Sequence, residues 1–153
     1  MAGCLFTNGT HVLAGYQGTI NGIGGKAEEG EEPQATALRE MLEEIFGLHS
    51  FDIEKIRLPP QKIIVKKSYN IFVYSFDDLE AMCSMLKGAG VVSPMYSEIP
   101  TTVWELIVKR LPVESEVRAL CILPVVDHPR HMPFVEPYFI SDIRALIKTE
   151  QSS

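Results

Sequence analysis

The chain has 153 residues, of which 46% are hydrophobic and 22% charged, and its formal net charge at pH 7 is −6. This length suits a single domain over residues 1–153 that is large enough for a real core. The acidic balance argues against broad electrostatic binding to nucleic acid, and no apolar run reaches the 18 residues of a membrane span, so no membrane partner is expected.

Strands and helices are predicted along the whole chain. In order, they are strands over 4–7 and 11–16, a glycine-rich passage over 18–25, a helix over 33–46, a strand or bent strand pair over 62–76, helices over 79–87 and 100–110, a strand over 116–126 and a helix over 141–148. The dipeptide Asn8-Gly9 is typical of a hairpin turn, and Ile, Val, Tyr and Phe enrich residues 62–76. This mixture predicts an α/β sandwich.

The helix ends are predicted from residues that suit first and last turns. Pro33 fits a first helical turn, and Gly47 fits a stop after the helix over 33–46. Asp77-Asp78 are expected to cap the helix over 79–87, and Ser141 is expected to cap the last helix.

The predicted helix over 33–46 carries three carboxylates on one face. At about 100° per residue, Glu40, Glu43 and Glu44 fall within an arc of about 100°. The opposite side carries the apolar residues Leu38, Leu42 and Ile45. Seen alone, such a pattern is usually a solvated helix face. Clustered anions nevertheless repel each other unless a positive group lies among them, and Mg²⁺ or Mn²⁺ is the natural partner because hard cations take oxygen ligands.

The spacing of residues between Gly25 and Leu48 resembles the Nudix box, G-x5-E-x7-R-E-U-x-E-E-x-G-U with U aliphatic. The matching residues, without a gap, are Gly25, Glu31, Arg39, Glu40, Met41, Glu43 and Glu44. Six of these positions demand one residue type each, so at a usage of about one in fifteen per type the match arises by chance about once in 10⁷ starting points. The match departs at its end, where Ile45 and Phe46 both precede Gly47-Leu48.

The Nudix resemblance implies a mixed central sheet between helices, with the box forming loop-helix-loop. Against that compact plan, residues 77–115 look like a helical insertion. The resemblance also implies metal-dependent hydrolysis of a nucleoside diphosphate linked to another group. The residues expected to bind Mg²⁺ or Mn²⁺ are Glu40, Glu43, Glu44, Gly25 and Glu31.

Two residues of the box have structural interpretations as well. Arg39 could hold a metal-ligating glutamate in place, or could simply pair with Glu43 one turn away. Glu31 could order the loop or bind metal, or could be an acidic residue placed before a helix N-terminus.

The residues just before the box narrow the expected substrate. The run from Asn21 to Glu31 resembles the N-G-x-G-G-K-x-x-x-G-E stretch of oxidised-purine nucleoside triphosphatases of the MutT-like group. By that resemblance Asn21 contacts the base edge, although an ordinary turn residue is an equal alternative. Gly24 and Gly25 would let the backbone approach metal and phosphate. Lys26 would meet a phosphate or lie exposed.

These motifs predict cleavage of a nucleoside triphosphate, with oxidised purines as the specific case, to a monophosphate and pyrophosphate. One alternative is removal of the cap from capped RNA, for which Lys62, Lys66, Lys67, Lys109 and Arg110 would supply positive charge. Hydrolysis of ADP-ribose or of dinucleoside polyphosphates also stays open. Another alternative, of a different class, is a catalytically silent module that binds nucleotides.

A glutamate is expected to accept the proton of the attacking water. Glu40 is the first choice, and Glu98, Glu116 and Glu136 are downstream candidates.

Three further sets of residues have mainly structural interpretations. Trp104 and Tyr96 could stack on a base, although a place in the core is commoner. The cysteines are odd in number and widely spaced, which suits reduced thiols in a cytoplasmic protein: Cys4, Cys83 and Cys121. The first twelve residues have neither a basic segment nor a long apolar one, so no secretory signal is expected.

Overall fold

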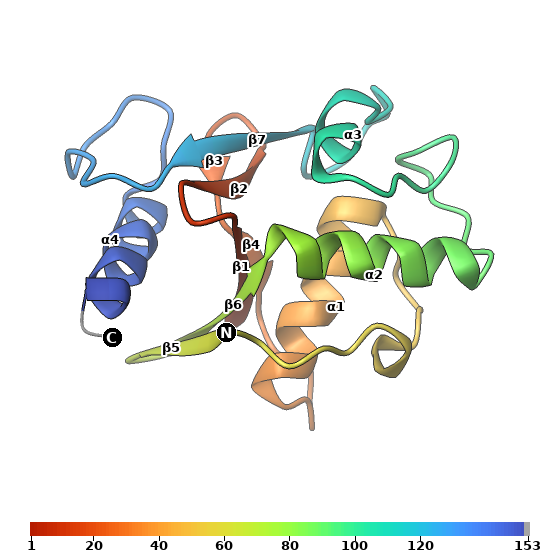
Figure 1. Ribbon diagram of the computed structural model, residues 1–153, viewed down its shortest axis with the longest axis horizontal. Helices are drawn as coiled ribbons and strands as arrows, with labels where there is room; N and C mark the ends of the chain where they lie inside the picture. Colours follow the sequence, from red (N-terminus) through yellow and green to blue (C-terminus); the bar gives the residue numbers. More distant parts are fainter. Residues whose placement is uncertain (152–153) are drawn as a thin grey trace.

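In the computed structural model, which describes residues 1–151, a mixed sheet lies between helices (Figure 1). Over these residues the sheet has seven strands: β1 (Ala2–Thr7), β2 (His11–Tyr16), β3 (Ile20–Asn21), β4 (Ile23–Gly25), β5 (Lys62–Lys66), β6 (Tyr69–Ser75) and β7 (Ala119–Pro124). The helices are α1 (Pro33–Phe46), α2 (Phe76–Gly88), α3 (Val103–Val108) and α4 (Pro137–Gln151), with a 3-10 turn over Ile53–Lys55. The predicted α/β class is confirmed, with strands paired both parallel and antiparallel.

Strand β1 lies at the centre of the sheet, and its pairing positions the glycine-rich strand β4. It pairs in parallel with β6 along its whole length, from Ala2↔Asn70 to Thr7↔Ser75. On its other edge it meets β2 only at Thr7↔Val12. The expected turn at Asn8-Gly9 is present, with Gly9 at a φ of 93°, but the two strands separate at once. Their separation leaves room for β4, which pairs antiparallel with the first half of β1.

Two apolar cores cover the two faces of the sheet. On β1, Ala2, Cys4 and Phe6 face the core that α1, α2 and α3 complete. Leu5 points the other way, into the core formed with α4, as the two-residue period of a strand requires. Figure 1 shows the same division, with α1 and α2 on one side of the sheet and α4 on the other. Each buried aliphatic or aromatic side chain contributes about 1.5–3 kcal/mol, so these cores hold the layers together.

Most of the predicted elements are present, but two predicted caps are wrong. Helix α1 has the predicted bounds and ends at Gly47, whose φ is 67°. Helix α2 is capped by Ser75, whose hydroxyl accepts from Asp78 N–H while the Asp78 carboxylate accepts from Ser75 N–H. Asp77 and Asp78 therefore lie inside the first turn. Helix α4 begins at Pro137, which suits a first turn, so Ser141 lies within the helix.

The remaining segments have the predicted type of secondary structure, strand or helix, but their bounds differ from the predicted ones. The region 62–76 is an antiparallel pair, β5 and β6. The predicted insertion over 77–115 contains α2 and the short α3. None of the helices in residues 1–151 has the length and apolar character needed to cross a lipid bilayer. The cysteines Cys4, Cys83 and Cys121 are all free.

Candidate functional site

Helix α1 places its three glutamates along one cleft. The cleft has a volume of ≈ 340 Å³ and is lined by Glu40, Glu43 and Glu44 on one side and by residues 113–117 on the other. The opposite side of α1 is buried in the core through the apolar residues Leu38, Met41, Leu42 and Ile45. Burial of that side fixes the rotation of the helix about its axis, so the predicted shared face of the three carboxylates is confirmed.

The backbone of β4 lies directly against these carboxylates. Gly24 N–H donates to Glu44 Oε1 at 3.1 Å. A Cβ at Gly25 would lie 2.5 Å from the Glu40 carboxylate, so Gly25 leaves the space that Glu40 occupies. At Gly24 the restriction has a different source, because a Cβ there would lie 2.6 Å from the Tyr69 hydroxyl and 2.7 Å from Ala2 O. Sheet packing thus accounts for Gly24, and the approach of Glu40 accounts for Gly25.

The carboxylates do not hold all their negative charge at neutral pH. Burial raises the pKa of Glu44 to about 8, and the neighbouring charges of Glu40 and Glu116 raise it further while the bond from Gly24 opposes the shift. Burial also raises the pKa of Glu40. The Glu40 and Glu44 carboxyl groups are within hydrogen-bonding range of each other. Their proximity raises the pKa of Glu44 further, and a cation between them would oppose this effect.

Arg39 joins the loop before α1 to the glutamates. Its guanidinium binds Glu31 through two bonds, Nε to Oε2 at 2.7 Å and Nη2 to Oε1 at 3.1 Å. Its Nη1 donates to Glu40 Oε1 at 3.1 Å and to Glu43 Oε1 at 3.3 Å. Hydrogen bonding from Arg39 lowers the pKa of Glu31 to about 2, so Glu31 remains ionised at neutral pH. Arg39 therefore pairs with Glu43, as its structural interpretation expects, and it also contacts Glu40; a role in holding a metal ligand stays a prediction.

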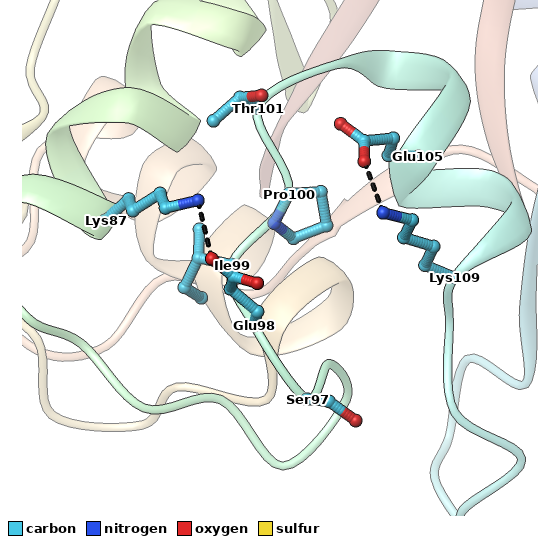
Figure 2. A pocket seen from close by; sticks show the side chains of 8 residues that line it. All are labelled: Lys87, Ser97, Glu98, Ile99, Pro100, Thr101, Glu105 and Lys109. Carbon is cyan, nitrogen blue, oxygen red and sulfur yellow. Dashed lines mark hydrogen bonds and ion pairs between the residues drawn. The ribbon is translucent and has the colours of Figure 1, made fainter.

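Of the three downstream glutamates, the structure brings one to the cleft. Glu116 lines it opposite α1. Glu98 lies in a separate pocket, shown in Figure 2, where it pairs with Lys87 at 2.9 Å while Lys109 pairs with Glu105 at 2.6 Å. Glu136 accepts from the Thr19 hydroxyl at 3.0 Å.

Sequence reasoning missed two side chains that line the cleft, Glu114 and His49. His49 Nδ1 is 3.8 Å from Glu43 Oε1. Neither residue belongs to a motif. The acidic pair Glu114 and Glu116, at the start of the strand predicted over 116–126, is the signal that the sequence offers for this wall.

Arg110, whose charge the capped-RNA alternative would use, is instead bound to main-chain carbonyls. Its Nη2 donates to Glu44 O at 2.8 Å and to Val117 O at 2.9 Å, and its Nη1 donates to Ile45 O at 2.5 Å. The Glu44 and Ile45 carbonyls are in the last turn of α1, where no helical partner is left for them, whereas Val117 follows the cleft residues 113–116. Arg110 thus fastens the end of α1 to the opposite wall of the cleft.

The aromatic residues also differ from expectation. Trp104 is 70% exposed, so its expected place in the core is wrong: the short α3 lies at the surface and its buried side chains are Val103 and Leu106. Tyr96 is buried, and its hydroxyl donates to Leu106 O at 2.6 Å. A stacking role for Tyr96 is excluded by this burial.

Asn21 and Lys26, the two other side chains expected to bind substrate, do not line the carboxylate cleft. The Asn21 side chain is buried, with Nδ2 donating to Thr19 Oγ1 at 3.0 Å and Oδ1 accepting from the Tyr138 hydroxyl at 3.0 Å. Its amide is therefore engaged within the protein. Lys26 is exposed, and its carbonyl accepts from Arg39 at 2.8 Å.

The chemistry of the cleft fits a hard divalent cation. Carboxylate oxygens, which Mg²⁺ and Mn²⁺ prefer, line it. A bound cation would favour the ionised form of Glu44, whose pKa is raised by burial and further by the charges of Glu40 and Glu116. Within residues 1–151, no group of three His, Cys, Asp or Glu side chains is already arranged around a single metal position. Binding would therefore draw the carboxylates together. No protein-family model and no curated protein sequence matches the chain.

Proposed function

We propose that the chain is a Nudix-type hydrolase that cleaves a phosphoanhydride of a nucleoside triphosphate, releasing a monophosphate and pyrophosphate. Its sheet with helices on both faces would then be the α/β/α sandwich of that family, with residues 25–48 as its loop-helix-loop. One observation carries the proposal: Glu40, Glu43, Glu44 and Glu116 share a cleft beside the Gly24-Gly25 backbone. Two of the four, Glu40 and Glu44, are partly desolvated, and burial raises the pKa of both carboxyl groups, a cost that a bound cation would offset.

Glu40, Glu43 and Glu44 are the residues that would hold Mg²⁺ or Mn²⁺, together with the carbonyl of Gly25. When bound, the cation neutralises phosphate oxygens and lowers the pKa of a water molecule. Glu31 is better suited to ordering the loop, because both its oxygens accept from Arg39 and one also accepts from the Thr36 hydroxyl at 2.7 Å. Arg39 in turn orients Glu40 and Glu43 by donating hydrogen bonds to both carboxylates.

Two glutamates are suited to accept the proton of the attacking water. Glu40 is our first assignment, since burial raises its pKa toward the working range and Arg39 fixes one of its oxygens. Glu116 approaches from the opposite wall and is the one downstream candidate in reach of the cleft. Glu98 and Glu136 are held elsewhere by Lys87 and Thr19.

The geometry gives capped RNA less support than nucleotides. Of the five basic residues that would contact RNA, three are engaged within the protein: Lys66 with Asp142, Lys109 with Glu105 and Arg110 with main-chain carbonyls. Lys62 and Lys67 belong to β5 and the turn that follows it, at the edge of the sheet, where lysines commonly protect a strand from pairing.

Separation of the reaction products by anion-exchange chromatography, on purified protein, tests the proposal, because, of the substrates compared, only a nucleoside triphosphate releases pyrophosphate. The substrates are nucleoside triphosphates, 8-oxo-purine triphosphates, ADP-ribose, dinucleoside polyphosphates and capped RNA, each with Mg²⁺, Mn²⁺ or EDTA. We expect metal-dependent turnover of a triphosphate that Glu44→Gln reduces at least 100-fold. Glu98→Gln is the matched control, because Glu98 is exposed and remote from the cleft. Turnover in EDTA, or equal turnover in both variants, contradicts the assignment.

A further inference from the structure

A basic cavity lies against α4, across the sheet from the helix that carries the carboxylates (Figure 1). Its volume is ≈ 430 Å³, and its lining residues come from the first half of α4 and from the loop that follows β7: Arg130, His131, Pro137, Ile140, Ser141 and Arg144. Two arginines and a histidine thus line the cavity, and no carboxylate does, although the net charge of the chain is −6. The cavity is suited to an anion.

The Arg144 guanidinium is held in place but keeps donors without a partner. Its Nη2 donates to His128 O at 2.5 Å. Asp127 Oδ1 lies 3.1 Å from its Nε, without the geometry of a hydrogen bond. Within residues 1–151, neither Nε nor Nη1 donates to any group. A buried donor such as this Nε is rarely left unsatisfied in native structures, so Arg144 is ready to bind a further acceptor.

The loop that carries Arg130 and His131 is anchored beside Arg144. His128 is buried, its Nε2 lies 2.8 Å from Pro124 O, and its carbonyl accepts from Arg144. Arg130 and His131 follow this anchor by two and three positions, and both are exposed. In the described part of the chain, neither side chain has an ion pair or a hydrogen bond. Their donors are therefore available to a ligand.

Ser141 adds a hydroxyl group to the wall of the cavity. Its Oγ accepts from Lys66 Nζ at 3.0 Å. Because a hydroxyl has one donor besides its acceptor positions, Ser141 can still donate to an anion. Lys66 also pairs with Asp142 at 2.6 Å, and Asp142 does not line the cavity. The acid nearest to Ser141 in sequence is thus already neutralised.

These donors match a phosphate group better than a carboxylate. A guanidinium donates through a planar fork that fits two phosphate oxygens. A phosphomonoester presents three terminal oxygens and about −1.5 to −2 charges at pH 7, so it can accept from Arg130, Arg144 and Ser141 together. The cavity has room for more than a phosphate, and Pro137 and Ile140 give it an apolar part. A volume above about 300 Å³ is typical of a site for a small organic ligand.

We propose that this cavity binds a small phosphomonoester, with Arg130, Arg144 and Ser141 holding its phosphate group and Pro137 and Ile140 contacting its organic group. The site is separate from the carboxylate cleft, since the two share no lining residue. It needs no metal, because the positive charge comes from the protein itself. The proposal therefore does not depend on the catalytic one.

Calorimetric titration of the full chain in EDTA tests the site, because the acids of the cleft repel phosphate when no cation is bound. The titrants are phenyl phosphate, inorganic phosphate and benzoate, which has the same ring with a carboxylate. We expect phenyl phosphate to bind about ten-fold or more tightly than benzoate, and about three-fold or more tightly than inorganic phosphate.

Arg130→Gln should weaken the binding of phenyl phosphate about ten-fold or more. Arg130 is exposed and has no partner in the described chain, so its replacement leaves the fold intact, as circular dichroism can verify. Arg118→Gln is the matched control, because it removes the same charge from an exposed arginine outside the cavity; it should leave the affinity unchanged.

Two results would overturn the proposal: equal affinity for phenyl phosphate and benzoate, or an effect of Arg130→Gln no greater than that of Arg118→Gln. Equal affinity for phenyl phosphate and inorganic phosphate would overturn the assignment of an ester. Since the titrations contain neither metal nor nucleoside triphosphate, their outcome and that of the hydrolysis assay are independent.

Discussion

The Arg110 guanidinium binds the main-chain oxygen of Glu44 at 2.8 Å and does not pair with its carboxylate. The same nitrogen reaches Val117 O at 2.9 Å. One half-buried cation therefore joins the two walls that carry Glu44 and Glu116, and it leaves both carboxylates to the cleft. The last turn of α1 is held without neutralising the acids that it positions.

We expect Arg110→Met to lower the free energy of unfolding by about 2–4 kcal/mol, because it removes the donors that satisfy the Glu44 and Ile45 carbonyls at the end of α1. Urea denaturation followed by circular dichroism measures the loss. Arg118→Met is the control, since Arg118 is exposed in the same region of the chain. A loss no greater than that of the control would show that Arg110 does not fasten the two walls.

We expect the metal-free protein to become less stable as pH rises from about 4.5 to about 8. The pKa of Glu44 is about 8 in the folded protein and 4.5 for the ordinary group, so the folded state binds the extra proton in this window. The free energy of unfolding therefore falls with increasing pH. Urea denaturation in EDTA at several pH values measures the slope.

Glu44→Gln provides the comparison for this pH dependence. Glutamine cannot ionise and its oxygen can still accept from Gly24, so the variant should be more stable than wild type at pH 8 and nearly equal to it below pH 4.5. Mg²⁺ or Mn²⁺ should stabilise wild type at pH 8 and stabilise the variant much less. An unchanged slope in Glu44→Gln would remove Glu44 as the source.

We expect Arg39→Lys to lower kcat at least ten-fold with little change in the circular dichroism spectrum. Lysine cannot form the two-bond contact with Glu31 and at the same time reach Glu40 and Glu43. Arg57→Lys is the matched control, because Arg57 pairs with Glu32 and Glu54 away from the cleft. Steady-state kinetics on the preferred nucleotide compare kcat of the two variants. Equal kcat values for Arg39→Lys and Arg57→Lys would assign Arg39 a purely structural role.

Among the downstream glutamates, only Glu116→Gln is expected to slow turnover, by about ten-fold or more. Glu98→Gln and Glu136→Gln should stay within about two-fold of wild type, because their carboxylates are bound to Lys87 and Thr19. The pH dependence of kcat in Glu40→Gln and Glu116→Gln then identifies the general base. The base is the glutamate whose replacement removes the fall of kcat at acidic pH. Full activity in both would exclude both assignments.

The sequence predicted what depends on local residues. Pro33, Gly47 and the helical period of the glutamates set the bounds and the exposed face of α1, and they need no information from elsewhere in the chain. The cap of α2 was wrong because Ser75, Asp77 and Asp78 all suit a helix start, and only the backbone conformation selects Ser75.

What the sequence missed depends on contacts between distant segments. The pairing of β1 with β6 joins residues about seventy positions apart, and the hairpin signal at Asn8-Gly9 does not report it. Glu116 and Arg110 reach the cleft only because the wall they belong to folds back on α1. Arginine is usually exposed and tryptophan usually buried. Arg110 is instead half-buried against main-chain carbonyls and Trp104 is exposed, so both were assigned to the wrong environments.

Gly25→Ala tests how closely the backbone must approach the acids. Gly25 does not have a positive φ, so alanine introduces no backbone strain, and its effect comes from the Cβ that would lie 2.5 Å from the Glu40 carboxylate. Glu40 must move, and we expect Mn²⁺ affinity and kcat to fall at least ten-fold while thermal unfolding shifts little. Gly88→Ala is the matched control, since a Cβ there meets nothing within 4 Å. Titration with Mn²⁺ followed by electron paramagnetic resonance measures the affinity directly. If Gly25→Ala binds Mn²⁺ as tightly as Gly88→Ala, Glu40 is not a metal ligand and the cluster must act through Glu43, Glu44 and Glu116.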